Sequence, residues 1–397
     1  MEQDLHRSFN ALKAYCEKEG FKGWDPYDGL NGKLFQSLPF FRNNRLARLA
    51  WIQLFKRSPV NLRRLTGVSK DYNPKGLGLF LQGYCNLYRI EKRPEYLEHI
   101  YSLADKVIGL QSKGYSGNCW GYNFDWQARA FFQPKYTPTV VATTFIATAL
   151  MQAHEVTGEE KYLKVATGAK NFILKDLNRT YDENGDFSFS YSPQDKTQVF
   201  NASLLGSRLL SLIYKYTGDK TLLEEASRSV RFCCRHQQEN GAWVYGTLPF
   251  HQWIDNFHTG YNLECIQVYQ DVSGDHSFAP QLKKGLEYYI NNFFTEEGIP
   301  KYYNDRIYPV DVHTVAQLII TLAQMRLLQQ HKPLAEKVLR WTVANMQDPK
   351  GYFYYQLKKG WSSKIPYIRW AQAWMFYGMS AYLLFLHDQT ESKKQKH

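Results

Sequence analysis

One short pattern recurs six times along the chain: a glycine followed closely by alternating aromatic residues. The six glycines are Gly23, Gly121, Gly185, Gly241, Gly298 and Gly351. The last four are spaced 53 to 57 residues apart, and the aromatic residues after them include Trp243, Tyr245 and Tyr352. A repeat at nearly constant spacing indicates a chain built from copies of one structural unit.

Each unit predicts a pair of helices joined by a short polar hinge. Glycines at three hinges, Gly158, Gly218 and Gly274, can end one helix in the left-handed conformation. The first helices are apolar nearly all round and cover residues 137–156, 198–216, 312–328 and 369–386. The second helices are amphipathic, as in residues 161–174 and 222–234. Because a helix that is apolar all round is buried, the units predict an inner and an outer layer of helices.

The number of hairpins predicts a closed ring. Five complete hairpins are expected to begin near Asn73, Pro138, Val199, Gly260 and Val312. A sixth inner helix is expected to begin near Ile368, and the helix expected at residues 4–18 supplies its missing outer partner. We therefore predict one all-α domain over residues 1–397, an (α/α)6 toroid of six helical hairpins closed by pairing of the N- and C-terminal helices.

Six αα-hairpins in a closed ring resemble the (α/α)6 toroid of many glycan-active enzymes, which include glycosidases, unsaturated-uronide hydrolases, uronate lyases and sugar 2-epimerases. Within that class, residues 120–127 (WGYNFDWQ) and 368–374 (IRWAQAW) look most like uncharacterised bacterial proteins associated with polysaccharide biosynthesis. The resemblance covers nearly the whole chain. It implies a carbohydrate-active protein of polysaccharide metabolism without assigning the reaction.

The loops that lead into the inner helices should gather at one end of the ring and form a funnel. The N–H groups and positive dipole ends of the inner helices favour an anionic ligand there. Aromatic faces stack on sugar rings, whereas Asp, Asn, Gln and Arg bind sugar hydroxyls. The candidate catalytic residues are Asp125, Asp255, His258 and Asp311. The candidate substrate-binding residues are Trp126, Gln127, Arg129, Asn201, Trp253, Tyr261, His313, Arg369 and Trp370.

Three reactions compete for this funnel. Glycosidic hydrolysis needs two carboxyl groups, and Asp125 with Asp255 is the leading pair. Uronate elimination needs a group such as Arg369 to neutralise the carboxylate and a base such as His258. Epimerisation needs two acid-base groups, for which His258 and His313 are the candidates. The sequence therefore predicts a protein that hydrolyses, eliminates or epimerises an acidic saccharide.

Each functional interpretation has an alternative. An aspartate just before a helix is often its cap, and Asp311 is the strongest such case. A non-catalytic glycan-binding or scaffold component of a polysaccharide assembly system is the alternative function. The sequence predicts no cofactor and no metal, because zinc held by Cys119, His251 and Asp255 lacks the Cys-His-Gly motif expected beside it. No P-loop, GxGxxG or GxSxG motif occurs.

The positive charge is concentrated in one segment. The chain has 49 Lys and Arg against 37 Asp and Glu, a net charge of +12, yet residues 42–75 alone contain nine basic residues and one acidic residue. In an insert at about 38–72, basic and apolar residues mix with Trp51 at helical spacing, which is typical of helices at an anionic membrane interface. Residues 38–57 are expected either to contact such a membrane or to pack on the toroid with their Arg residues in solvent. An acidic saccharide or polysaccharide is the expected ligand, and no nucleic acid is expected because no recognised module is present.

The six cysteines form no CxxC pair, which favours a reducing compartment. The N-terminus lacks the apolar run of a signal peptide, and no segment approaches the length of a transmembrane helix. We expect a cytoplasmic protein, membrane-peripheral if the insert binds lipid. A short Lys-rich tail is expected at residues 388–397.

Overall fold

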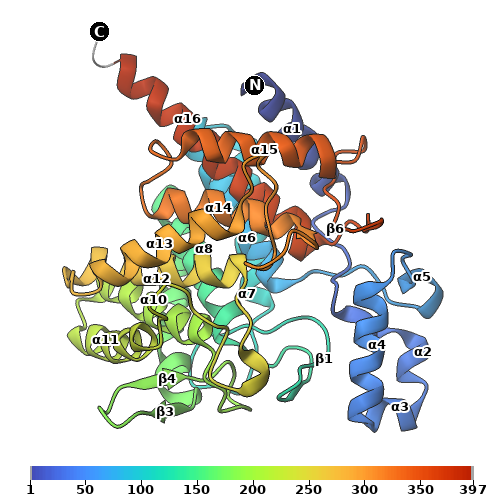
Figure 1. The fold of residues 1–397 in the computed structure, drawn as a ribbon, viewed down its shortest axis with the longest axis horizontal. Helices are drawn as coiled ribbons and strands as arrows, with labels where there is room; N and C mark the ends of the chain where they lie inside the picture. The colour runs from blue at the N-terminus through green and yellow to red at the C-terminus, as the bar shows by residue number, and fades with distance from the viewer. Residues whose placement is uncertain (1, 395–397) are drawn as a thin grey trace.

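The computed structural model describes residues 2–394 (Figure 1), and the contacts between its inner helices form a closed ring. The inner helices are α6 (Pro74–Ile90), α8 (Val140–Thr157), α10 (Phe200–Thr217), α12 (Asn256–Ser273), α14 (Val312–Gln324) and α16 (Trp374–Lys394). Each packs on the next in this order, and α16 packs back on α6. The all-α (α/α)6 toroid predicted from the repeats is therefore confirmed.

The outer layer supplies one partner for each inner helix. It consists of α1 (Glu2–Lys18), α7 (Pro94–Gly109), α9 (Glu160–Gly168), α11 (Lys220–Arg235), α13 (Ala279–Phe293) and α15 (Lys332–Met346). The N-terminal helix α1 packs against both α15 and α16. Ser8 of α1 donates a hydrogen bond of 2.7 Å to Gln347, just after α15. The predicted pairing of the two ends of the chain thus seals the ring.

The repeated glycines explain how one hairpin docks on the next. Gly241 and Gly351 adopt φ of +92° and +97°, which glycine accepts at little cost. A Cβ on Gly241 would lie 2.3 Å from the carbonyl oxygen of Lys284 in α13, and one on Gly351 would lie 2.3 Å from that of Ala11 in α1. At these two glycines, the turn between two hairpins therefore packs directly on the backbone of the next outer helix.

The sequence placed the start of one inner helix incorrectly. Helix α12 begins at Asn256, not near Gly260, because the Asp255 side chain caps it by accepting a hydrogen bond from the His258 backbone N–H. Gly260 lies inside the helix, where a Cβ would meet Gln317 and Thr321 of α14 at 2.8 Å. The glycine permits close helix packing and does not start the helix.

Two further helices differ locally from the expectation. The sixth inner helix begins with π-helical turns (Ile368–Ala373) before α16, and α9 is followed by a π-helical segment (Phe172–Asp176). The predicted tail is helical as far as Lys394, and its last three residues lie outside the described residues.

Short antiparallel strands occur in the loops. They are β1 (Trp126–Gln127) with β2 (Phe132–Gln133), β3 (Arg179–Tyr181) with β4 (Phe187–Phe189), and β5 (Val310–Asp311), β6 (Gln356–Lys358) and β7 (Trp361–Ser363) in that order. Strand β5 pairs through Asp311 with Gln356, which holds two successive inter-hairpin loops together.

The insert forms a small helical layer at one side of the ring (Figure 1). It begins before the insert expected at about 38–72, and it contains the 3-10 helix Asp28–Asn31, α2 (Lys33–Gln36), α3 (Pro39–Asn43), α4 (Arg45–Arg57) and α5 (Arg63–Thr66). Fully buried Arg63 donates to Asp28 within the insert (2.7 Å), and it fixes the insert to the toroid by donating to the Asp25 carbonyl (2.6 Å) and to the Tyr367 hydroxyl (2.9 Å). Among residues 2–394, no helix is long and apolar enough to cross a membrane.

A buried carboxyl group of the inner ring predicts a pH-dependent stability. Glu264 of α12 accepts a hydrogen bond of 2.8 Å from Thr321 and one from Gln317, both in α14. Burial raises its pKa to about 7, against the opposing effects of Arg208 and these hydrogen bonds. Because the pKa is higher in the folded chain, the stability that protonated Glu264 provides is complete at low pH and is lost as the pH rises through 7.

We therefore expect Glu264→Gln to flatten this dependence. Between about pH 4 and about pH 8, the wild-type free energy of unfolding should fall by about 3 kcal/mol more than that of the variant. Urea denaturation at several pH values measures the difference, and Glu183→Gln, at an exposed glutamate, is the matched control. Parallel stability curves for wild type and Glu264→Gln would contradict the expectation.

Candidate active site

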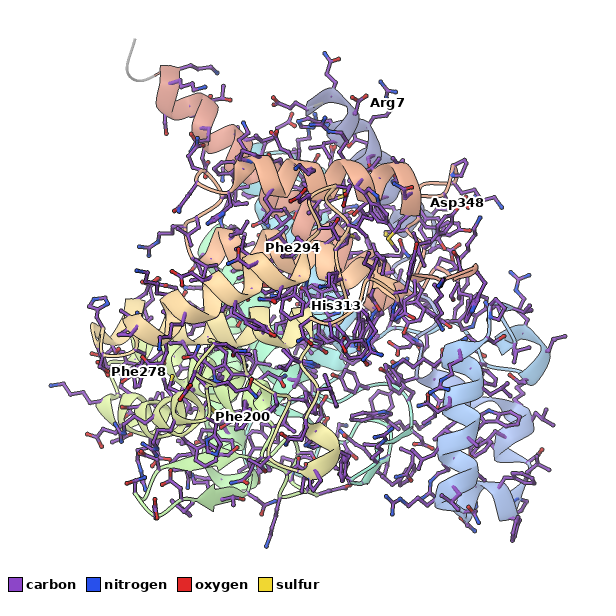
Figure 2. The ribbon with its side chains drawn as sticks, viewed as in Figure 1. Arg7, Phe200, Phe278, Phe294, His313 and Asp348 are labelled. Carbon is purple, nitrogen blue, oxygen red and sulfur yellow. The ribbon has the colours of Figure 1, made fainter. Side chains whose placement is uncertain are left out.

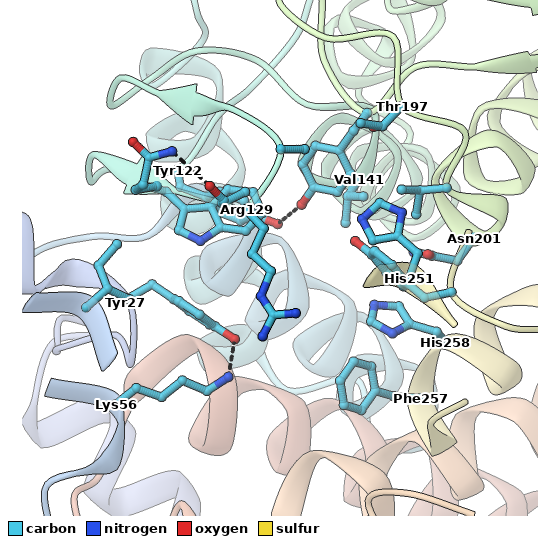
Figure 3. Close-up of a pocket in the computed structure, with 18 of the residues that line it drawn as sticks. Tyr27, Lys56, Tyr122, Arg129, Val141, Thr197, Asn201, His251, Phe257 and His258 are labelled. Carbon is cyan, nitrogen blue, oxygen red and sulfur yellow. Dashed lines mark hydrogen bonds between the residues drawn. The ribbon is translucent and has the colours of Figure 1, made fainter. Parts of the chain in front are cut away.

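A cavity of about 380 Å³ lies where the inner-helix N-termini meet helix α4 of the insert (Figure 3). One face of α4 contributes Leu49, Ile52, Gln53 and Lys56 to its wall. The loops of the ring and the first turns of the inner helices contribute the remaining side chains, most of them aromatic or basic. His313, which lines the cavity, lies near the centre of the molecule (Figure 2). The insert therefore completes a site that the toroid alone would leave open.

Ten of the residues proposed from the sequence line this cavity. They are Trp126, Gln127, Arg129, Asn201, Trp253, His258, Tyr261, His313, Arg369 and Trp370. The other three, Asp125, Asp255 and Asp311, do not line it. Among the described residues, the cavity wall contains no Asp or Glu side chain.

Asp125 lies in a separate depression between the insert and the ring, together with Asp25, Asp28 and Asp71. One carboxylate oxygen of Asp125 accepts a hydrogen bond of 2.8 Å from the backbone N–H of Lys135. The side chain therefore fixes the loop that carries Trp126 and faces away from the cavity.

Asp255 connects a helix cap to a cavity side chain. Its buried carboxylate accepts the His258 backbone N–H at 3.0 Å and lies 2.9 Å from His258 Nδ1. A carboxylate held at Nδ1 fixes the imidazole tautomer with the proton on that nitrogen, which leaves Nε2 free to accept a proton. The pair therefore has the geometry of an oriented general base.

Asp311 caps α14 and holds an aromatic wall in place. It accepts hydrogen bonds from the His313 backbone N–H (3.0 Å), Gln356 Nε2 (2.6 Å) and Trp370 Nε1 (3.0 Å). Burial raises its pKa to about 6 although these donors favour the carboxylate. The contact with the Trp370 indole fixes the orientation of that ring at the cavity wall.

His313 forms a buried pair with Tyr261. The Tyr261 hydroxyl lies 3.0 Å from His313 Nε2, and the imidazole stacks between Phe257 and Trp374 with ring centroids 4.5 and 4.1 Å away. Burial, helped by Lys75, His258 and Arg369, lowers the pKa of His313 well below 6.5. The imidazole is therefore neutral at neutral pH.

Four cations reach the cavity. The Arg369 guanidinium donates to both carboxylate oxygens of buried Asp25 at 2.6 and 2.8 Å. Lys56 donates to the Tyr27 hydroxyl at 2.8 Å, and Arg129 projects into the cavity from its mouth (Figure 3). The fourth cation, Lys75, is buried. Neither Lys56 nor Lys75 was selected from the sequence.

A positional signal would have identified Lys75. The second residue of each inner-helix segment lines the cavity, counting the sixth from the π-helical turns at Ile368. These residues are Lys75, Val141, Asn201, Phe257, His313 and Arg369. Three of them were proposed because of their side-chain type, but aligning the six helix starts would have selected all of them.

No family model matches the chain, and no curated protein matches it. Several solved structures match the chain. Cellobiose 2-epimerase from Bacillus thermoamylovorans is 13% identical over 80% of this chain and 88% of that chain, with a TM-score of 0.61. An α-mannanase from Bacteroides thetaiotaomicron is 14% identical over 79% and 87%, with a TM-score of 0.59. An unsaturated glucuronyl hydrolase specific for heparin is 13% identical over 82% and 89%, with a TM-score of 0.59. The chain has the (α/α)6 toroid fold of these carbohydrate-active enzymes.

Proposed function

We propose that this protein is an enzyme that transfers a proton at a carbon atom of an acidic saccharide, by epimerisation or elimination. The observation that carries the proposal is the oriented pair of Asp255 and His258 in a cavity lined by imidazoles, phenols and cations. A carbon next to a carboxylate or carbonyl becomes acidic enough for an imidazole to deprotonate when nearby cations stabilise the resulting anion.

His258 Nε2 takes the proton from carbon, and Asp255 stabilises the imidazolium that forms. The electron pair moves into the neighbouring carbonyl or carboxyl group, giving an enolate. The charge then either returns to carbon with a new proton or expels a leaving group from the adjacent carbon. The Tyr261–His313 pair is the second proton carrier, because its phenol ring centroid lies 5.8 Å from that of His258.

Hydrolysis is less consistent with this cavity. The two-carboxyl mechanism requires both groups to flank the scissile bond, whereas Asp125 lies outside the cavity and Asp255 is committed to the α12 cap and His258. We therefore replace the pair Asp125 and Asp255 with Asp255 and His258, in which Asp255 is a positioning residue. The aromatic rings of Trp126, Trp253 and Trp370 provide stacking faces for sugar rings.

The second part of the proposal concerns the insert, whose exposed face combines apolar and basic side chains. Its large apolar residues are 36% to 81% exposed and are Leu34, Leu38, Phe40, Phe41, Leu46, Leu54, Val60 and Leu65. The exposed cations among them are Lys33, Arg42, Arg45, Arg57 and Arg64. No acidic residue occurs between Asp28 and Asp71. We define these thirteen residues as the insert face.

We propose that the insert face docks on an anionic membrane surface. Apolar side chains at this density mark an interaction surface, and interleaved cations without any acid select negatively charged lipid headgroups. Helix α4 connects this face to the site, because Leu46 and Leu54 point outward while Ile52 and Lys56 line the cavity. Docking would bring a membrane-bound acidic glycan to the cavity mouth.

All six cysteines are buried and unpaired, which supports a cytoplasmic location.

Proton transfer is tested by deuterium incorporation. In D2O, wild-type protein should introduce deuterium at carbon into a uronate-containing oligosaccharide, detected by mass spectrometry and NMR. His258→Gln should slow this incorporation by about 100-fold or more, because the base is lost. Asp255→Asn should also lose most of the activity with little change in melting temperature, because Asn still caps α12 but does not hold the required tautomer.

Asp125→Asn is the matched control for Asp255→Asn. Because Asp125 lies outside the cavity, this variant should retain wild-type incorporation. Glycan cleavage by water without deuterium at carbon, abolished by Asp125→Asn, would instead support hydrolysis. Saccharide binding without any turnover would support the non-catalytic alternative.

Membrane docking is tested by vesicle flotation. Wild-type protein should float with phosphatidylglycerol-containing vesicles and not with pure phosphatidylcholine vesicles. Arg42→Gln with Arg57→Gln should reduce partitioning by about 30-fold, since each interfacial cation contributes about 1 kcal/mol. Phe40→Ser with Leu46→Ser should reduce it as well, by removing apolar insertion.

The controls carry equivalent changes away from the insert face. Arg326→Gln with Tyr181→Ser alters one exposed cation and one exposed aromatic residue elsewhere and should float like wild type. Equal flotation of wild type and both insert variants would rule out the proposed docking surface.

A further inference from the structure

Lys75 differs from the other cations of the cavity because it is buried and yet has no hydrogen-bonded or ion-paired partner among the described residues. Arg369 is neutralised by Asp25 through two hydrogen bonds, and Lys56 is bonded to the Tyr27 hydroxyl. Arg129 is exposed at the cavity mouth. The Lys75 side chain is only 3% exposed, yet within the described residues it forms no hydrogen bond and no ion pair.

Aromatic rings surround the Lys75 ammonium. Its nitrogen lies 4.2 Å from the ring centroid of Phe145, 5.1 Å from that of Trp374 and 5.6 Å from that of Tyr261. Ring faces attract a cation but provide no counter-charge. Burial, helped by Arg369, lowers the pKa of Lys75 well below 10.5, because the charged form has no hydrogen-bonding anion. A ligand anion in the cavity would supply the missing partner and stabilise the ammonium form.

We infer that Lys75 binds the carboxylate of the saccharide at the floor of the cavity, beside Tyr261 and His313. This inference rests on the proposed function and specifies the substrate class as a uronate. Lys75 occupies the second position of α6, where the positive end of the helix adds to the attraction for an anion.

The position of Lys75 also relates the carboxylate to the proton-transfer groups. The Lys75 nitrogen lies over the Tyr261 ring, whose centroid is 6.1 Å from that of His313 and 5.8 Å from that of His258. A carboxylate bound at Lys75 therefore lies on the same side of the cavity as these acid-base groups. When carbon loses a proton, the carboxylate gains a second negative charge, and the ammonium stabilises that charge where it develops.

The sequence favours Arg369 for this role, but the structure makes it less suitable. The Arg369 guanidinium is already bound to Asp25, so a ligand carboxylate would have to compete with a buried carboxylate that holds the two ends of the chain together. Lys75 needs no such exchange. Arg369 instead acts as a fixed positive charge beside the carboxylate that Lys75 holds.

Equilibrium binding tests this inference without requiring turnover. Isothermal titration calorimetry compares three matched pairs: D-glucuronate with D-glucose, D-galacturonate with D-galactose, and D-mannuronate with D-mannose. Wild-type protein should bind at least one uronate more tightly than its neutral partner. Lys75→Met should weaken the binding of that uronate by about 10-fold to 100-fold, which is the range expected for a hydrogen bond to a charged group. The binding of the neutral hexose should not change.

The variants are chosen to separate binding from folding. Methionine suits the aromatic surroundings, and removing an unpaired buried charge should maintain the melting temperature of Lys75→Met. Lys75→Gln provides a second, polar variant with the same expected loss of uronate binding. Lys106→Met removes an equivalent lysine that lies over the Tyr72 ring outside the cavity, so it should bind like wild type.

The outcomes separate this inference from the proposed reaction. Uronate preference that survives in Lys75→Met and Lys75→Gln, or its absence from wild-type protein for all three pairs, would overturn the assignment of Lys75. Selective uronate binding that depends on Lys75, without deuterium incorporation, would overturn the proton-transfer proposal and support the Lys75 site. Deuterium incorporation into neutral hexoses, without any preference for binding uronates, would overturn the Lys75 assignment and support the proton-transfer proposal.

Discussion

The ring depends on the contacts that the glycine turns at Gly241, Gly298 and Gly351 make with the backbone of the following outer helix. At Gly351 the turn presses on Ala11 of α1, so the contact that joins neighbouring hairpins also joins the last hairpin to the N-terminal helix. A side chain there would overlap backbone atoms, which cannot move without displacing the helix. The same glycine that marks the repeat in the sequence therefore determines both the stacking of the units and the closure of the ring.

Closure brings six helix N-termini to one cavity. Because the units are equivalent, the second residue of each inner helix reaches the same wall, although the side chains range from Val141 to His313. The helical hairpin repeats six times, whereas the side chain at the second position of the inner helix differs from one hairpin to the next. Two residues of this set, Lys75 and Arg369, are cations with opposite environments, since one is neutralised by Asp25 and the other has no hydrogen-bonded or ion-paired partner in the part of the chain described.

The sequence predicts the parts of this structure that repeat. Periodicity identified the toroid, and residue chemistry identified ten of the residues that line the cavity. The sequence could not assign roles to the aspartates. A carboxylate before a helix can either cap that helix or face the cavity, and the direction of the side chain decides between the two roles. Asp255 and Asp311 point back to their helices. The bond between Asp25 and Arg369 joins residues 344 positions apart, which local pattern does not reveal.

The insert contributes positive charge both to the cavity wall and to its own exposed surface. Its helix α4 has one face in the cavity wall and another among the exposed apolar and basic side chains. A rigid helix with both faces engaged relates any surface that it touches to the cavity in a fixed geometry. Arg63 maintains that geometry, because its buried hydrogen bonds to the Asp25 carbonyl and the Tyr367 hydroxyl would have to break before the insert could move away. In the proposed function, helix α4 therefore couples the two sites physically, because it links the cavity that would bind an acidic sugar to the insert face that would contact the membrane.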